Sequence, residues 1–133
     1  MLAVEVAVIP DKPTVLVVED EVLIRLMVAD ELRDRGLQVL EASNADEALR
    51  ILESSLSVHL LFTDVRMPGR MDGLALTRLA HSRFPQLKLI VASSRRPDDS
   101  PPPHADAFLS KPYDLNKMIE QVERLLAHVA NDR

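Results

Sequence analysis

Acidic side chains directly follow two apolar runs of the chain, and they are its clearest candidates for chemistry. Residues Val15–Val18 are all apolar, and three acids, Glu19–Glu21, come immediately after them. A second, mostly apolar run, 58–63, ends in Asp64. Grouped carboxylates repel one another and offer hard oxygen ligands, so their natural partner is a cation such as Mg²⁺ or Ca²⁺. The alternative is a solvated first turn of a helix, where acids complement the helix dipole.

A hydroxyl group and an amine stand at the ends of two later apolar runs. Residues 87–92 lead into Ser93 and Ser94, and residues 107–110 lead into Lys111. Such runs are typical of strands in a parallel sheet covered on both faces, and these sheets bind ligands outside the carboxyl ends of their strands. The acids, a serine and the lysine would then share one rim. There a carboxylate can attack phosphorus, while a hydroxyl and an ammonium group bind phosphoryl oxygens.

Strands and helices alternate along the chain. The expected strands cover residues 14–18, 37–42, 58–64, 87–94 and 107–111. Apolar residues at helical spacing predict helices over 21–36, 44–54, 73–84 and 115–130. The first helix is indicated by Val22, Leu23, Leu26, Met27 and Leu32. This alternation predicts an α/β fold with a doubly wound, five-stranded parallel sheet.

Composition limits the class of protein. The 133 residues fit one domain, and a net charge of -5 argues against a general attraction to nucleic acid or anionic membranes. There are no cysteines, which excludes disulfides and thiol chemistry, and no apolar stretch reaches membrane-spanning length. We therefore expect a soluble, cytoplasmic protein with a flexible lead over 1–13, one domain over 14–130 and a short tail over 131–133.

Five motifs in order carry a family resemblance. The segments VLVVEDE, TDVRMPG, MDGL, VASS and FLSKPY resemble the receiver domain of two-component response regulators, the CheY-like family, over roughly residues 14–130. The resemblance implies a flavodoxin-like sheet with strand order 2-1-3-4-5. It also implies that Asp64 is the phosphoacceptor. Glu19, Asp20 and Asp64 would hold Mg²⁺ together with the backbone carbonyl of Arg66.

The resemblance also assigns roles at the later strands. Ser93 matches the switch hydroxyl, with the neighbouring Ser94 left as an alternative, and Lys111 matches the phosphate-binding lysine. Pro112 matches a proline that commonly follows this lysine through a cis bond. Phe108 matches the switch aromatic that turns inward when the hydroxyl moves. From the residues alone, Lys111 could be a solvated lysine and Phe108 a core aromatic.

Two features depart from the family pattern. Arg70 lies between MPG and MDG, where many receivers have no residue. Residues 95–106 contain four prolines and are too short for the usual fourth helix. We therefore expect this helix to be short or missing, and we doubt the ordinary dimer through the fourth helix, fifth strand and fifth helix.

By this resemblance the chain accepts a phosphoryl group on Asp64 from a sensor histidine kinase or a histidine phosphotransfer protein. It is not an enzyme in the usual sense, although it takes part in its own phosphorylation and dephosphorylation. Its output would be a contact with an unknown downstream protein, without direct DNA binding or membrane insertion. The alternatives are a receiver-like interaction module that is never phosphorylated and an aspartyl-phosphate phosphatase of the haloacid dehalogenase type. The phosphatase usually has a second aspartate two residues after the first, which TDVRM lacks.

Overall fold

The sheet is parallel throughout and runs in the order β2-β1-β3-β4-β5. The structure is a computed structural model and describes residues 12–54, 56–67, 69–94 and 104–131. The strands are β1 (Thr14–Val18), β2 (Gln38–Ala42), β3 (Leu60–Asp64), β4 (Lys88–Ser93) and β5 (Ala107–Ser110). Both the parallel sheet and its strand order are as predicted.

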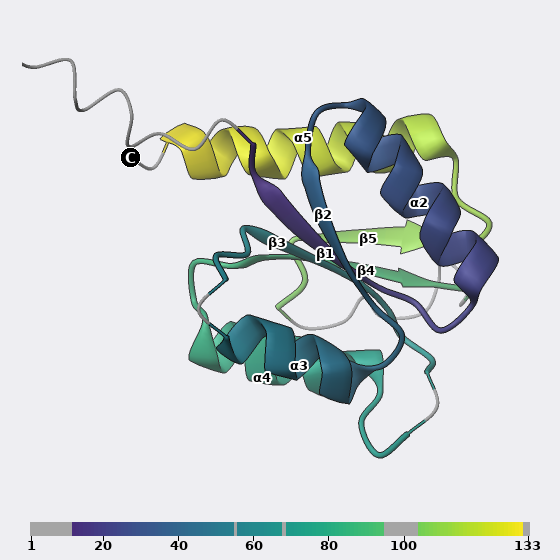
Figure 1. The fold of residues 1–133 in the computed structure, drawn as a ribbon, viewed down its shortest axis with the longest axis vertical. Helices are drawn as coiled ribbons and strands as arrows, with labels where there is room; N and C mark the ends of the chain where they lie inside the picture. The colour runs from purple at the N-terminus through teal and green to yellow at the C-terminus, as the bar shows by residue number, and fades with distance from the viewer. Residues whose placement is uncertain (1–11, 55, 68, 95–103, 132–133) are drawn as a thin grey trace, which may run out of the picture.

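Helices cover both faces of this sheet (Figure 1). One face carries α2 (Val22–Asp34) and α5 (Leu115–Asn131), and the other carries α3 (Ala45–Glu53) and α4 (Gly73–Arg83). Asn44 begins α3 by accepting a hydrogen bond from the Glu47 N–H at 2.8 Å. Asp72 begins α4 in the same way, with the Ala75 N–H at 2.9 Å. The doubly wound fold is therefore confirmed.

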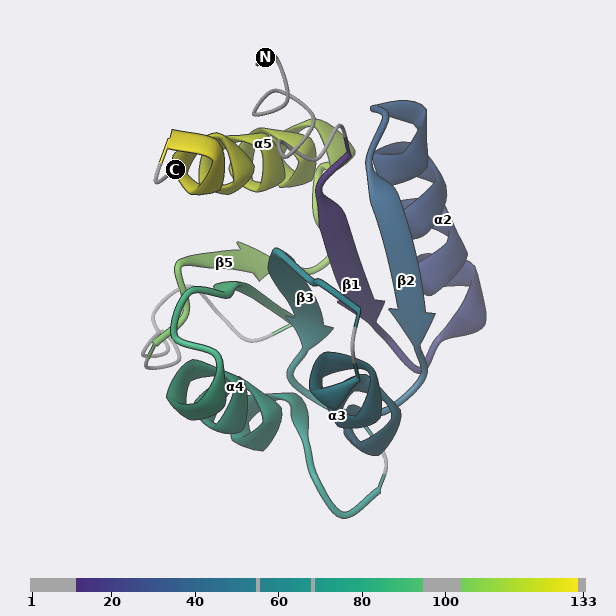
Figure 2. The same ribbon diagram turned by 60° about the vertical axis from the view of Figure 1, so that its left-hand side comes forward.

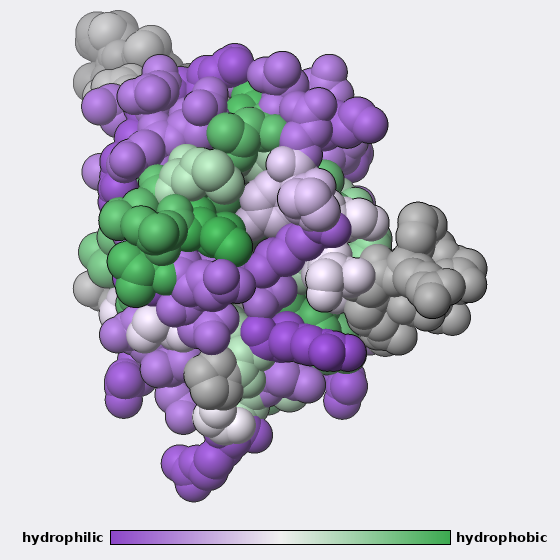
Figure 3. All heavy atoms as spheres, turned by 90° about the vertical axis from the view of Figure 1, so that its right-hand side faces the viewer, coloured by the Kyte–Doolittle hydropathy of each residue, from purple (hydrophilic) through white to green (hydrophobic). Residues whose placement is uncertain are grey.

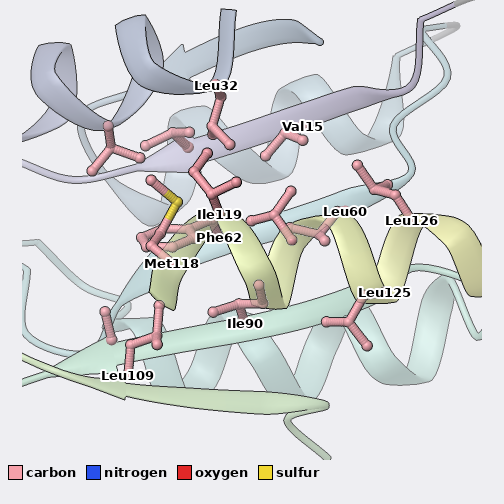
Figure 4. Packing of buried hydrophobic residues seen from close by; sticks show 14 residues of the cluster. Val15, Leu32, Leu60, Phe62, Ile90, Leu109, Met118, Ile119, Leu125 and Leu126 are labelled. Atoms are coloured by element: carbon pink, nitrogen blue, oxygen red, sulfur yellow. The ribbon is translucent and has the colours of Figure 1, made fainter. Parts of the chain in front are cut away.

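The core consists of two apolar clusters, one on each face of the sheet. Strand β1 supplies both clusters, because successive side chains of a strand point to opposite faces. Val15 and Val17 pack on the side of α2 and α5, whereas Leu16 and Val18 pack on the side of α3 and α4. Figure 4 shows the first cluster, in which side chains of α5 lie against those of the central strands. An uninterrupted apolar run is therefore what this central strand requires.

The apolar residues that predicted α2 do not form its buried face, apart from Leu32. The buried residues of this helix are Val28, Ala29 and Leu32. Four large apolar residues near its start are exposed, Leu23 most of all at 82%. We call them the α2 patch, which consists of Val22, Leu23, Leu26 and Met27. The helix packs at the edge of the sheet against β2 and β1, so these side chains face solvent, and Figure 3 shows apolar atoms gathered on this side.

Three of the predictions fall wholly or largely outside the described residues. Residues 1–11 of the expected lead lie outside them, as do residues 132–133 of the expected tail. The same holds for residues 95–103, so a short or missing fourth helix stays a prediction. Within the part of the chain that the structure describes, none of the helices combines the length and apolar character needed to cross a membrane.

Candidate functional site

Parallel pairing brings the carboxyl ends of four strands together at one end of the sheet. Glu19 comes directly after β1, Asp64 ends β3, Ser93 ends β4 and Lys111 follows β5. The strand register sets these residues side by side, since Asp64 pairs with Ala92, the residue before Ser93. The sheet thus gathers the residues that the sequence placed at strand ends.

Three carboxylates form a cluster at the carboxyl ends of the strands. Glu19, Asp20 and Asp64 each offer an oxygen atom, and these oxygens all lie within 4.8 Å of one another. Glu19 and Asp64 are buried, whereas Asp20 is exposed. Several carboxylate oxygens that converge beside solvent suit a small hard cation that retains some of its water, as Mg²⁺ does. The donor set therefore fits the predicted metal. Arg66, whose backbone carbonyl was the other predicted ligand, is exposed and lies in the loop just after β3.

Lys111 lies between two of the acids. Its Nζ is 2.8 Å from Oε1 of Glu19 and 3.3 Å from Oδ1 of Asp64. Burial raises the pKa of both carboxyls above their ordinary values, and Lys111 offsets only part of the rise. Burial of Lys111 works to lower its own pKa, but its hydrogen bond to Glu19 and the nearby negative charges outweigh burial and raise the pKa. The site thus keeps one ammonium group among buried carboxylates, ready to pair with further negative charge.

The start of α4 lies against the backbone of the central acid. The Gly73 N–H donates to the carbonyl of Val65 at 2.8 Å. A Cβ atom on Gly73 would lie 1.8 Å from the carbonyl oxygen of Asp64, so no larger residue fits without movement. This contact was not among the predictions from the sequence. The signal was a glycine at the first position of a predicted helix, where it is a weak helix former.

The two adjacent serines occupy different environments. Ser93 is 2% exposed, and its carbonyl accepts a hydrogen bond from the Lys111 N–H at 2.7 Å. Ser94 is exposed. Phe108 is half-buried on β5, one residue before the buried Leu109 and therefore on the opposite face of the strand.

An aromatic pair supports the site from the first core cluster. Tyr113 packs edge-on against Phe62, with ring centroids 5.8 Å apart and ring planes at 82°. Burial raises the pKa of Tyr113 to about 12, so its phenol keeps its proton at neutral pH. The peptide bond between Lys111 and Pro112 is cis, as the resemblance implied. Tyr113 was not among the predicted site residues.

A pocket of about 380 Å³ opens beside the exposed acid of the cluster. It lies between the start of α3 and the loop before α4, and its lining includes Asp20, Asn44, Arg70 and Met71. Arg70, which we predicted to be an added residue, therefore borders the approach to the acidic cluster from this side.

Comparison with known proteins gives one family. The sequence matches the family described as the response regulator receiver domain over residues 15–123. Curated relatives include the DNA-binding transcriptional regulator NtrC of Salmonella typhimurium, which is 34% identical over 86% of this chain. Another is the sensor kinase CckA of Brucella abortus, which is 36% identical over 85% of this chain. The chain spans 25% of the length of NtrC and 12% of the length of CckA.

Solved structures agree with this match. The response regulator TrrA of Thermotoga maritima, in complex with Mg²⁺ and BeF, superposes with a TM-score of 0.77. It is 28% identical, and the alignment covers 85% of this chain and 98% of that one. The receiver domain of the hybrid histidine kinase CckA gives a TM-score of 0.73 at 35% identity, with coverage of 85% and 98%.

Proposed function

The chain belongs to the response regulator receiver domain family, and we propose that it accepts a phosphoryl group from a histidine kinase on Asp64. The observation that carries this proposal is the position of Lys111 Nζ, which lies 3.3 Å from the Asp64 carboxylate and 2.8 Å from that of Glu19. An ammonium group held at this point can pair with oxygens on a phosphorylated Asp64. The protein is not a conventional enzyme, because its chemistry is confined to its own side chain.

The transfer replaces one bond to phosphorus by another. The bond between phosphorus and the donor imidazole nitrogen breaks as a bond to an Asp64 carboxylate oxygen forms, and the released imidazole takes up a proton. Lys111 stabilises the charge that the phosphoryl oxygens bring into a partly buried site. Mg²⁺ held by Glu19, Asp20, Asp64 and the carbonyl of Arg66 would supply further charge neutralisation when bound. The structure of TrrA in complex with Mg²⁺ and BeF supports the same chemistry here.

The signal would pass through the end of β4. Phosphorylation adds about 1.5 to 2 negative charges. Ser93 ends β4 beside Asp64, and its hydroxyl would turn toward the phosphoryl oxygens. Phe108 on the neighbouring β5 would move inward with it, which changes the surface presented to a downstream protein.

The donor protein must reach Asp64 over the carboxyl ends of the strands. The α2 patch begins two residues after Asp20 and exposes four large apolar side chains there. An exposed apolar patch next to a reactive group is typical of a protein contact. We therefore place the kinase, or a histidine phosphotransfer protein, on this patch and expect the encounter to take place in the cytoplasm.

Intact mass after incubation with acetyl phosphate tests the chemistry. The wild type should gain one phosphoryl group in the presence of Mg²⁺ and none after chelation. Asp64→Asn should gain none under either condition. Asp30→Asn, which removes an exposed carboxylate on α2, serves as the control and should behave as the wild type. Absence of the adduct, together with an unchanged amide spectrum on adding beryllofluoride and Mg²⁺, would contradict phosphoryl acceptance.

A further inference from the structure

The side chain of Arg25 connects the acidic cluster to β2, the outermost strand of the sheet. Its Nη1 donates a hydrogen bond to the backbone carbonyl of Glu19 at 2.8 Å. Its Nε donates to Oε1 of Glu41 on β2 at 3.1 Å. The side chain is only 16% exposed. Because α2 runs alongside β2 (Figure 2), one guanidinium joins the loop after β1, the helix and the outermost strand.

Glu19 is held by its neighbours through several polar groups. Its N–H donates to the carbonyl of Ala42 at 3.1 Å. One carboxylate oxygen accepts from Lys111 at 2.8 Å, and the other accepts from the Glu21 N–H at 3.2 Å. Its carbonyl is the group that Arg25 binds. The position of this buried acid therefore depends on four hydrogen bonds, each to a different residue.

The carbonyl bound by Arg25 belongs to the peptide group that joins Glu19 to Asp20. Asp20 is the exposed member of the acidic cluster, so its own surroundings restrain it less than those of a buried acid. The orientation of this peptide sets the direction in which the Asp20 side chain leaves the backbone. A group that fixes the peptide therefore fixes how the oxygens of Asp20 and Asp64 converge.

Arginine suits this task better than lysine. Its planar guanidinium carries donors at fixed angles and can bind two acceptors at once, whereas an ammonium group is a point donor on a flexible chain. The two acceptors here are a neutral carbonyl and the carboxylate of Glu41, which balances the charge of Arg25. The arginine can therefore hold the peptide without adding unpaired charge beside the acids.

We propose that Arg25 is a positioning residue that orients the Glu19–Asp20 peptide and thereby sets the affinity of the acidic cluster for Mg²⁺. This inference rests on the proposed function, which requires the metal. Arg25 itself does not touch the metal or the phosphoryl group; it acts through the backbone of the residues that do. Hydrogen-bond partners behind metal ligands typically change metal affinity by roughly 10- to 100-fold when they are removed.

The chain supplies a matched control in Arg33. Its Nη2 binds the other carboxylate oxygen of Glu41 at 3.0 Å and the carbonyl of Val39 at 3.1 Å. Arg33 and Arg25 therefore share an acidic partner and lie on the same helix. Only Arg25 also contacts Glu19. A general effect of the Glu41 ion pairs on stability would appear in both variants, whereas an effect on the metal site would appear in one.

The experiment is a Mg²⁺ titration of the full chain followed by amide NMR spectra. Arg25→Gln should raise the Mg²⁺ midpoint roughly 10- to 100-fold, and Arg33→Gln should titrate as the wild type. Arg25→Lys keeps the positive charge but loses the planar guanidinium that binds two acceptors at once, so its Mg²⁺ midpoint should lie between those of Arg25→Gln and the wild type. The chemical shifts of core amides far from the acids show whether each variant is folded. If Arg25→Gln does not fold, Arg25→Lys still tests the inference.

Two results would overturn the inference while leaving the proposed function intact. One is an Arg25→Gln midpoint equal to that of the wild type, and the other is an equal increase in Arg33→Gln, with the Asp64 adduct still formed by the wild type. A wild-type chain without a saturable Mg²⁺ response would overturn the inference as well. In that case the mass measurement decides separately whether Asp64 accepts phosphate.

Discussion

Helices α2 and α5 cover the same face of the sheet but use their apolar residues differently. Among the side chains of α5 that the structure describes, five large apolar ones are buried, namely Met118, Ile119, Val122, Leu125 and Leu126. Helix α2 buries three residues and leaves the α2 patch exposed. The two helices also differ in location, because α5 packs across the central strands β3 and β4, while α2 packs beside the edge strand β2. The difference teaches that the burial of an apolar stretch depends on the strands that its helix packs against; the exposed stretch beside the site is the one that we propose as the docking surface.

The largest effect should come from truncating α5. Met118 is fully buried, so Met118→Ala should lower the free energy of unfolding by about 2 to 5 kcal/mol, through lost burial and the cavity left behind. Denaturant unfolding of the purified chain measures this loss. Leu23→Ala is the matched change on α2 and should alter the same free energy by less than about 0.5 kcal/mol. Equal losses in the two variants would break the comparison between the helices.

A medium effect is expected when the α2 patch loses its apolar character. The double variant Leu23→Ser and Met27→Ser should slow phosphotransfer from a histidine kinase about tenfold. This corresponds to a loss of about 1.4 kcal/mol in the free energy of binding between the kinase and the patch. Phosphorylation by acetyl phosphate should stay at the wild-type rate, since this small donor does not touch the patch. Radiolabelled transfer from a purified kinase that phosphorylates the wild type measures the difference. Equal slowing with both donors would place the effect in the site and not in docking.

The smallest effect concerns the cost of the acidic site itself. The pKa of Asp64 is raised by burial, so protonation favours the folded state and the carboxylate destabilises it at neutral pH. Asp64→Asn should therefore be more stable than the wild type at neutral pH. Its advantage should shrink as the pH falls through the raised pKa toward the ordinary value of an aspartate. Denaturant unfolding at several pH values tests this, and a constant difference would mean that the carboxylate is not the cause.

The sequence predicted the strands and their terminal residues because these follow from local patterns. Burial on both faces makes β1 uniformly apolar, and the acid after it is visible by position alone. The exposure of Leu23 could not be predicted, because it depends on which strand the helix packs against. The contact between Arg25 and Glu41 could not be predicted for the same reason, because it depends on the packing of α2 beside β2, the strand that carries Glu41. Ser93 and Ser94 are chemically identical in the sequence, and only the end of β4 separates a buried serine from an exposed one.

The contact of Gly73 with the backbone of Asp64 has a consequence for the length of the loop between them. The loop is fixed at both ends, because the Val65 N–H binds the carbonyl of Ala92 and the Val65 carbonyl binds the Gly73 N–H. A residue added to the loop at Arg70 therefore lies between two fixed points and leaves Asp64 in place. The chain has no cysteine, so Arg70→Cys would create a unique attachment point for a fluorophore. A label there would border the pocket beside Asp20 and report on its surroundings without moving the strand that carries Asp64.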